Sequence, residues 1–419
     1  MFIKLGLLKT NRNYRYLYLA QLISYIGSMM TYVAIPYQIY ELTKSSFWVG
    51  ILGSIQLLPL LIFGLLGGVI ADSMNRKKII IIAEVCLALA SLALFFNTSS
   101  ENPMAGLIFV IAASMSALVG FHRPAMEAIT PQIVAKEHLT QIAALNSFKF
   151  SFCAILGPAI SGFIIAQYGL KVIYILDFLT FAASIFFLMK VKIPNFSIAA
   201  KTGNAIQSVK DGIKYALSRP ELVGTYVVDI LAMVFAMPMA LYPAMAASWG
   251  GPTAAGWLYS AIPAGSLIVS LLSGWTHKIQ RHGAAVIISA SLWGCAIVAL
   301  AFANSLPLAF LCLVLAGAAD MVSAVFRSTI WNETIPTDRR GRLASIEMIS
   351  YMSGPMLGNA RAGYVASVSS NFISILSGGI ICIIATLACI WLLPKFWKYN
   401  SKAHTQQAST TNNELKAQD

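Results

Sequence analysis

The chain has 419 residues, of which 58% are hydrophobic and 11% are charged. Soluble globular proteins contain about 25% charged residues, so this composition excludes an ordinary water-soluble fold. The formal net charge is +13, but the basic residues are spread over short loops between apolar segments, which argues against a nucleic-acid partner.

Apolar runs of about 20 residues are typical of transmembrane helices. Taken in chain order, they predict twelve spans, at residues 15–40, 47–70, 78–96, 104–126, 139–165, 169–189, 221–246, 254–276, 284–303, 306–330, 342–367 and 371–393. The expected fold class is therefore an all-α integral membrane protein.

A polar stretch separates the first six spans from the last six. The predicted parts are a six-helix half at 1–189, a cytoplasmic linker at 190–220, a second six-helix half at 221–398 and a disordered cytoplasmic tail at 399–419.

Basic residues lie before the first span, after every even-numbered span and in the tail, whereas the opposite loops hold only Lys44 and Lys171. The positive-inside rule then places both termini in the cytoplasm.

The two halves resemble each other weakly. Residues 141–163 align with a later segment so that Ala143, Gly157 and Gly162 correspond to Ala344, Gly358 and Gly363. Small residues at helix contacts make chance agreement an alternative, but the common spacing favours two parallel six-helix repeats with a site between them, which is a transporter architecture.

Specific motifs strengthen this interpretation. Residues 67–78 read GGVIADSMNRKK, and this stretch resembles the loop signature of the major facilitator superfamily. FHRPAMEAITP and LGNARAG resemble the branch of that superfamily that contains enterobactin (siderophore) exporters. The resemblance implies a multi-pass protein of the bacterial cytoplasmic (inner) membrane, with twelve helices in two six-helix pseudo-repeats.

Several charged residues near the predicted cytoplasmic ends of spans are candidates for a gate. The resemblance implies that Asp72 contacts the other half when the protein is open outward, and Arg76 can pair with it. The remaining members of the predicted gate or latch are Arg123, Glu127, Arg327 and Glu347. For these four residues the alternative is a permanent interfacial ion network. For Asp72 and Arg76 it is a positive-inside anchor with ordinary turn chemistry.

Ionisable residues inside spans are costly and usually functional. Asp229 and Asp320 lie well inside the seventh and tenth spans, and we predict that they couple transport to protons; the alternative is a structural role beside a cation. Glu84, close to Lys77 and Lys78, and Asp177 are predicted to be structural.

Lys149 and Arg361 lie inside spans without an obvious local acid. Each can serve an anionic substrate or neutralise a buried acid. The predicted substrate-binding residues are Tyr32, Lys149, Phe235 and Tyr242, since aromatic rings stack well on a large flat ligand. Packing or a lipid-facing belt is the alternative for the rings.

No phosphate-binding loop, HExxH or nucleophile elbow is present in the sequence. We therefore expect no enzyme activity, no cofactor and no metal site. We expect the protein to be a monomer. Its expected partners are the lipid bilayer, protons and a small-molecule substrate.

The predicted function is secondary active export of a small molecule, by implication a siderophore, through proton antiport and alternating access. Multidrug efflux and proton-coupled import on the same fold are the alternatives, together with a membrane sensor that transports nothing.

Overall fold

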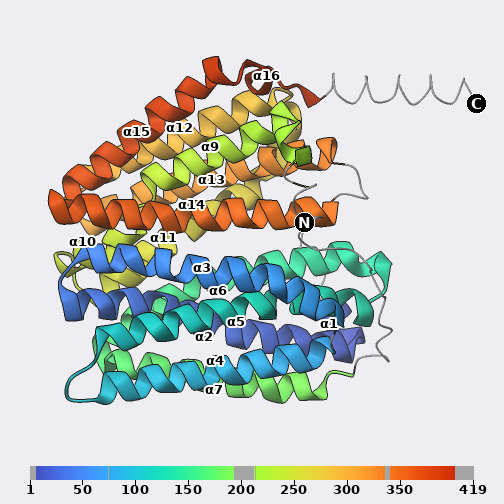
Figure 1. Ribbon diagram of the computed structural model, residues 1–419, viewed down its shortest axis with the longest axis vertical. Coiled ribbons are helices and arrows are strands. Elements are labelled where there is room, and N and C mark those ends of the chain that lie inside the picture. The colour runs from blue at the N-terminus through green and yellow to red at the C-terminus, as the bar shows by residue number, and fades with distance from the viewer. Residues whose placement is uncertain (1–5, 74, 193–211, 213, 336–339, 402–419) are drawn as a thin grey trace, which may run out of the picture. The chain divides into compact units, whose positions relative to one another are not determined.

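The computed structural model describes residues 6–73, 75–192, 212, 214–335 and 340–401, and the described part is helical and contains no strand. All twelve predicted spans coincide with helices (Figure 1). The long helices are α2 (Arg12–Thr43), α3 (Ser46–Ser73), α4 (Arg76–Ser99), α5 (Ala105–Ile133), α6 (Leu139–Tyr168), α7 (Leu170–Lys190), α9 (Pro220–Ala236), α11 (Pro252–Leu272), α12 (His282–Ala301), α13 (Leu306–Thr334), α14 (Arg340–Val368) and α15 (Asn371–Leu392). The short elements are α1 (Gly6–Thr10), η1 (Lys136–His138), η2 (Met239–Leu241), α10 (Tyr242–Ala247), η3 (Ser273–Lys278) and α16 (Pro394–Trp397).

The chain forms two compact units. The first consists of residues Met1–Thr202 and Met239–Pro263, and the second of residues Gly203–Pro238 and Ala264–Asp419. The predicted domain boundaries at 190–220 and 399 stay a prediction.

Within the described residues, 11 helical segments are long and apolar enough to cross a membrane. Helix α14, at the predicted eleventh span, is not one of them, although it has 29 residues. Its sequence includes Arg340, Arg342, Glu347 and Arg361, and these charges lower its apolar character.

The seventh span is interrupted. Helix α9 ends at Ala236, and Met237 has an extended backbone with ψ 114°. Pro238 explains the break, because a proline disfavours the helical conformation of the residue before it and has no N–H for the helical ladder. The helix resumes as η2 and α10.

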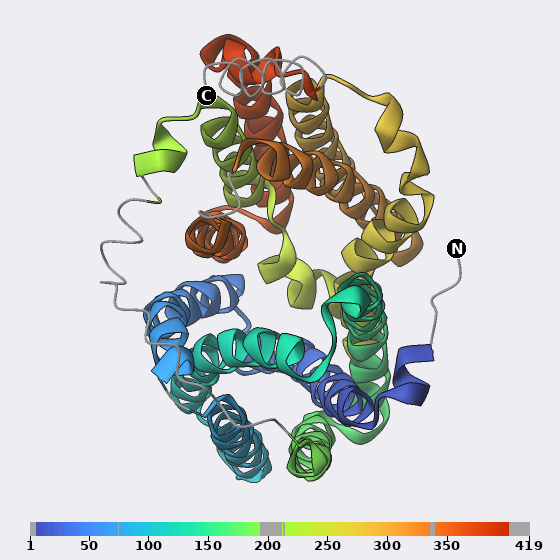
Figure 2. The same ribbon diagram turned by 90° about the vertical axis from the view of Figure 1, so that its right-hand side faces the viewer.

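The same helix pairs recur in both units. In the first unit α2 packs against α6 and α7, and α4 packs against α5 and α7. In the second unit α9 packs against α14 and α15, and α12 packs against α13 and α15. Each pair of the second unit corresponds to a pair of the first, six spans earlier, which agrees with two six-helix pseudo-repeats. Figure 2 shows many of these helices nearly end-on.

The turn between α3 and α4 is held by helix-end interactions. Asn75 is the N-cap of α4 and accepts hydrogen bonds from the backbone N–H groups of Lys77 and Lys78. The Arg76 guanidinium donates to the carbonyl of Ala128 at 2.9 Å, and Lys77 Nζ donates to that of Val191 at 2.6 Å. These carbonyls lie near the C-terminal ends of α5 and α7, where the helix dipole is negative and favours cations.

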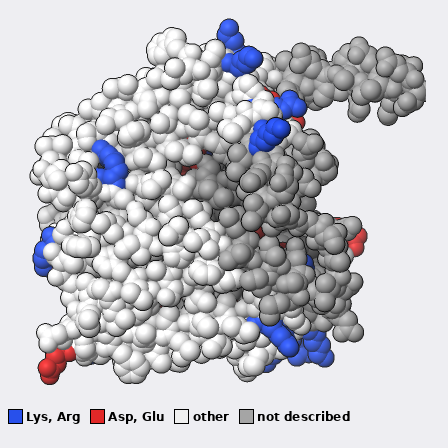
Figure 3. All heavy atoms as spheres, viewed as in Figure 1, with Lys and Arg blue, Asp and Glu red and all other residues white. Residues whose placement is uncertain are grey.

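The outer surface suits a lipid environment. On the face shown in Figure 3, uncharged residues cover most of the area, and Lys and Arg appear at a few separate places. Large apolar side chains such as Leu58, Phe96 and Trp391 are more than half exposed, which in water would favour aggregation.

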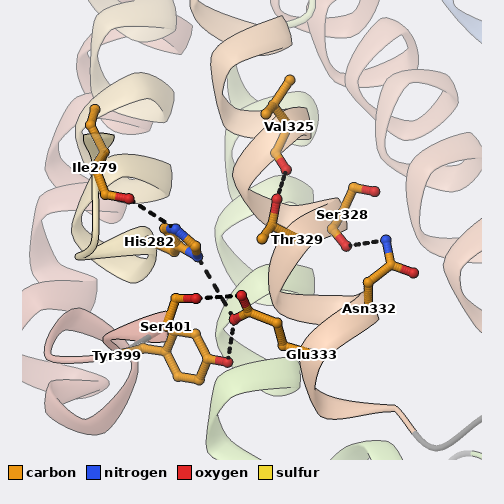
Figure 4. A network of polar contacts seen from close by, with 9 residues as sticks. All are labelled: Ile279, His282, Val325, Ser328, Thr329, Asn332, Glu333, Tyr399 and Ser401. Carbon is orange, nitrogen blue, oxygen red and sulfur yellow. Dashed lines mark hydrogen bonds and ion pairs between the residues drawn. The ribbon is translucent and has the colours of Figure 1, made fainter. Parts of the chain in front are cut away.

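Helix α16 packs against α9, α12 and α15 of the second unit. Phe396 of α16 is fully buried, and a Cβ at Gly224 of α9 would overlap its ring. Beside it, Glu333 accepts hydrogen bonds from the hydroxyls of Tyr399, at 2.9 Å, and Ser401 (Figure 4). Burial raises the pKa of Tyr399, so this hydroxyl keeps its proton and remains a donor.

We predict that Phe396→Ala lowers the free energy of unfolding by about 3 kcal/mol, the usual cost of emptying a buried aromatic site. Thermal unfolding in detergent would measure the loss. Trp391→Ala is the matched control, since Trp391 is 76% exposed and its replacement should have a much smaller effect. Equal destabilisation by the two changes would contradict the proposed packing role of Phe396.

Candidate functional site

A charged triad lies between α9 and α13 of the second unit. Arg327 Nη1 forms an ion pair with Asp229 Oδ1, and Arg327 Nη2 lies 3.5 Å from Asp320 Oδ1. Asp320 and Arg327 are seven residues apart, about two helical turns, so they share one face of α13. Arg327 is a predicted gate residue, and the two aspartates are the predicted proton-coupling residues; the structure brings all three together.

Neighbouring contacts fix the position of this triad. The indole N–H of Trp331 donates to Thr225 Oγ1 at 3.2 Å. Trp331 lies one turn after Arg327 on α13, and Thr225 lies one turn before Asp229 on α9, so this bond sets the register of the two helices. Glu347 of α14 also interacts electrostatically with Arg327.

The triad contains two carboxylates and one guanidinium, so it has a net negative charge that one proton would neutralise. The side chain of Asp229 is 8% exposed and that of Asp320 is 30% exposed. Asp229 is therefore the closer and more buried ion-pair partner of Arg327, whereas Asp320 is more accessible and more distant. A proton on Asp320 would leave the buried Asp229–Arg327 pair intact.

Lys149 of α6 lies in the first unit among neutral partners. Its ammonium donates to Gln21 Oε1 and, at 3.1 Å, to Asn146 Oδ1, and it lies 5.7 Å from the ring centroid of Tyr18. No ion pair is found for it among residues that the structure describes. A half-buried ammonium held only by amides and a ring is suited to bind an anion.

Arg361 of α14 has a different environment. Its guanidinium donates to the carbonyls of Phe235, at 2.8 Å, and Ser374, at 3.1 Å, and to Ser377 Oγ at 2.9 Å. Phe235 lies in the last turn of α9, where carbonyls have no partner within the helix. Arg361 therefore caps the interrupted seventh span, a role that no sequence motif indicates.

The other predicted gate residues lie in the first unit. Arg123 Nε donates to Glu127 Oε1 at 3.1 Å, one helical turn along α5. The two side chains are 42% and 69% exposed, so the pair contributes little stability. Asp72 belongs to α3, but its side chain lies outside the described residues, and the predicted Asp72–Arg76 contact stays a prediction.

The predicted aromatic residues fall into two environments. Tyr32 and Tyr242 both pack edge-on against Tyr259, with centroids 5.7 and 5.0 Å from its ring. The Tyr32 hydroxyl also lies 3.5 Å from Met239 Sδ. These residues belong to the first unit, whereas Phe235 belongs to the second.

The neighbour that the structure gives Glu84 comes from another helix. Glu84 is fully buried, and its Oε1 faces His122 Nε2 of α5 at 3.5 Å. The nearby Lys77 binds the carbonyls of Met189 and Val191 instead. Glu84 therefore points into the bundle, toward α5, and its structural role stays a prediction.

Nearly the whole chain matches a known family. Residues 8–418 match the model of the transmembrane secretion effector family. The chain belongs to this family of the major facilitator superfamily. It is a multi-span membrane protein whose family and relatives are transporters and not enzymes.

Its curated relatives include enterobactin exporters named EntS. The protein from Shigella boydii is 27% identical over 384 residues, which are 90% of this chain and 91% of the relative. One from Escherichia coli is 25% identical over 414 residues, 97% of this chain and 98% of the relative.

Solved structures agree on the fold. A peptide transporter POT in complex with sulfate has a TM-score of 0.73 at 11% identity, covering 93% of this chain and 96% of its own. The nucleoside transporter NupG has a TM-score of 0.67 at 13% identity, covering 92% and 98%. At this level of identity the likeness concerns the fold alone.

We predict that Asp229→Asn lowers the free energy of unfolding by about 3 kcal/mol, because removing one partner of a buried ion pair leaves the other uncompensated. Asp320→Asn should cost about 1 kcal/mol, since Asp320 is more exposed and farther from Arg327. Glu127→Gln is the control for loss of an exposed carboxylate, and thermal unfolding in detergent measures all three. A larger loss of unfolding free energy for Asp320→Asn than for Asp229→Asn would show that Asp320, and not Asp229, is the stronger ion-pair partner of Arg327.

Proposed function

We propose that the protein exports an anionic siderophore of the enterobactin kind across the bacterial cytoplasmic membrane, in exchange for protons. The observation on which the coupling rests is Arg327 held between Asp229 and Asp320. The direction of transport and the substrate class are supported by the relatives, which are named enterobactin exporters. This chain matches them over nearly their full length.

The triad suits proton exchange because its net charge changes with the protonation of Asp320. With Asp320 protonated, Asp229 and Arg327 form a neutral pair. With Asp320 charged, Arg327 is shared by two acids, and the excess negative charge in a span favours uptake of a proton or a change of conformation. A cycle that exposes Asp320 to the two sides of the membrane in turn would thus move one proton.

Lys149 supplies a candidate contact for the substrate. Catecholate and carboxylate groups are anionic acceptors, and a charged hydrogen bond to the ammonium is stronger than a neutral one. In the absence of substrate, Gln21 and Asn146 satisfy the ammonium without neutralising it, so an arriving anion does not have to displace an acid.

The remaining residues receive supporting roles. Tyr32 and Tyr242, with Tyr259, offer aromatic edges for a flat ligand, and Phe235 lies where Arg361 caps the broken helix. The pair of Arg123 with Glu127 and the turn of Asp72 and Arg76 would change partners as the cytoplasmic side opens. We place both termini in the cytoplasm, from the positive-inside rule, and propose a monomer.

The coupling role predicts that the two aspartate variants differ. In proteoliposomes, Asp320→Asn should lose accumulation of enterobactin driven by a pH gradient and keep exchange of labelled for unlabelled enterobactin, because an amide resembles the protonated acid. Asp229→Asn should lose both, because Arg327 is left without its firm partner. Normal gradient-driven accumulation by both variants would refute coupling at this triad.

The substrate role of Lys149 predicts a change in apparent affinity. Lys149→Gln should raise the enterobactin concentration for half-maximal transport by about 10- to 100-fold, since a hydrogen bond to a charged group contributes about 1.5–3 kcal/mol. Lys171→Gln is the control, because Lys171 is exposed at the start of α7. An unchanged affinity for enterobactin, or transport only of cationic drugs, would favour multidrug efflux and leave Lys149 as a structural residue.

A further inference from the structure

A second buried acid, which the proposed mechanism does not use, lies in the first unit. Asp177 of α7 is fully buried. Its Oδ2 accepts hydrogen bonds from the hydroxyls of Thr31 of α2, at 2.7 Å, and Ser91 of α4, at 2.8 Å. Its Oδ1 is also buried and has no hydrogen-bond partner.

No positive group compensates this carboxyl. Among described side chains, no Lys, Arg or His lies within ion-pair distance of Asp177. The titratable groups on the helices packed around it include Tyr174 on the same helix, Glu84 on α4 and His122 on α5, which faces Glu84. A buried carboxylate without a cation is costly, and such groups bind a proton or a metal cation to reduce the charge.

The packing around Asp177 favours a proton over a metal cation. A Cβ added to Gly27 would lie 2.6 Å from Asp177 Oδ1, so the unpaired oxygen packs directly against the backbone of α2. The Thr180 hydroxyl donates to the Asp177 carbonyl at 2.8 Å and also lies beside the carboxyl, so it fills further space there. A metal cation needs several oxygen ligands around an open centre, and this packing leaves no such centre.

We propose that Asp177 is a proton-binding site of the first unit, separate from the Asp229–Arg327–Asp320 triad, and that its proton is exchanged during transport. Only the exchange rests on the proposed antiport; binding of the proton does not.

Hydrogen-bond counting shows how the site can hold or release a proton. Ser91 has one hydroxyl hydrogen but two acceptors in range, Asp177 Oδ2 and the carbonyl of Leu87 at 3.1 Å. When Asp177 is charged, Ser91 donates to it. When Oδ2 bears a proton, that proton is donated to Ser91 Oγ and the serine donates to Leu87. Rotation of one hydroxyl therefore accommodates either state without an unsatisfied donor.

Polar groups continue on both sides of Asp177. One turn before it on α7, Tyr174 donates to Gln38 Oε1 at 2.7 Å, and Gln38 donates to Thr98 Oγ1 at 2.9 Å. Thr98 is seven residues after Ser91, about 10 Å along α4.

In the other direction, the buried Ser184 lies seven residues after Asp177 and Glu84 lies seven before Ser91. Since α4 and α7 are antiparallel neighbours, Ser184 and Glu84 fall at the same level. The side-chain oxygens of both lack hydrogen-bond partners. Polar groups thus lie at three heights along the helix axis, those of Thr98, of Asp177 with Ser91, and of Glu84 with Ser184. Together they cover about 20 Å of the span.

Infrared spectroscopy of the protein in lipid tests proton binding without any substrate. A protonated carboxyl group has a carbonyl stretching band that a carboxylate lacks. We expect a band at neutral pH that disappears in Asp177→Asn and persists in the control Glu127→Gln, which removes an exposed carboxylate. Spectra of the wild type and Asp177→Asn with no difference in this region would overturn the proposal.

Ser91→Ala provides a second, milder variant in case Asp177→Asn does not fold. Loss of the hydroxyl removes the acceptor of the bound proton, so the Asp177 band should move in frequency. An unmoved band would contradict the assigned hydrogen bond.

Transport measurements test exchange of the proton. At a gradient of one pH unit, loss of one coupled proton lowers the steady accumulation ratio of enterobactin by about tenfold, since one pH unit is a tenfold ratio. Asp177→Asn should show this loss and retain labelled exchange within about twofold of wild type. Full accumulation by Asp177→Asn would refute exchange at this site, whereas absence of gradient-driven accumulation in the wild type would refute the antiport and leave the infrared result to decide proton binding.

Discussion

The contact on which the proposed mechanism depends is the guanidinium of Arg327 between two carboxylates inside the second unit. In a low-dielectric span, one arginine can neutralise one acid, and the second acid creates an imbalance that a proton can remove. The unequal exposure of Asp229 and Asp320 is the reason that we propose different tasks for the two acids. The Trp331–Thr225 bond and the cap that Arg361 forms on the broken helix hold the surrounding helices in place.

The fold could be predicted from the sequence because a membrane span needs about 20 apolar residues and this requirement is local. All twelve predicted spans coincide with helices, including α14, whose charges weaken the apolar pattern. The apolar pattern alone does not show the break after Ala236, which Pro238 causes in the seventh span. The repeat, visible in the sequence only as a few matching small residues such as Gly157 and Gly358, appears in the structure as recurring pairs of helices.

The candidate site was only partly predictable. Charge inside an apolar run was enough to select Asp229, Asp320 and Lys149, and a spacing of seven residues could have joined Asp320 to Arg327. The partners contributed by distant helices could not be found in this way: Asp229 for Arg327, Gln21 for Lys149 and His122 for Glu84. Asp177, predicted to be structural, has a distinctive environment only because Thr31 and Ser91 come from two other helices and offer no cation.

The central claim is that siderophore and protons move in opposite directions, and the most direct test follows protons while enterobactin alone supplies the driving force. Wild-type proteoliposomes containing a pH-sensitive dye would receive an enterobactin gradient with no pH gradient imposed. Export by antiport predicts a proton flux opposite to the enterobactin flux, which is lost in Asp320→Asn. A proton flux in the same direction as enterobactin, or enterobactin movement without any proton flux, would contradict the account.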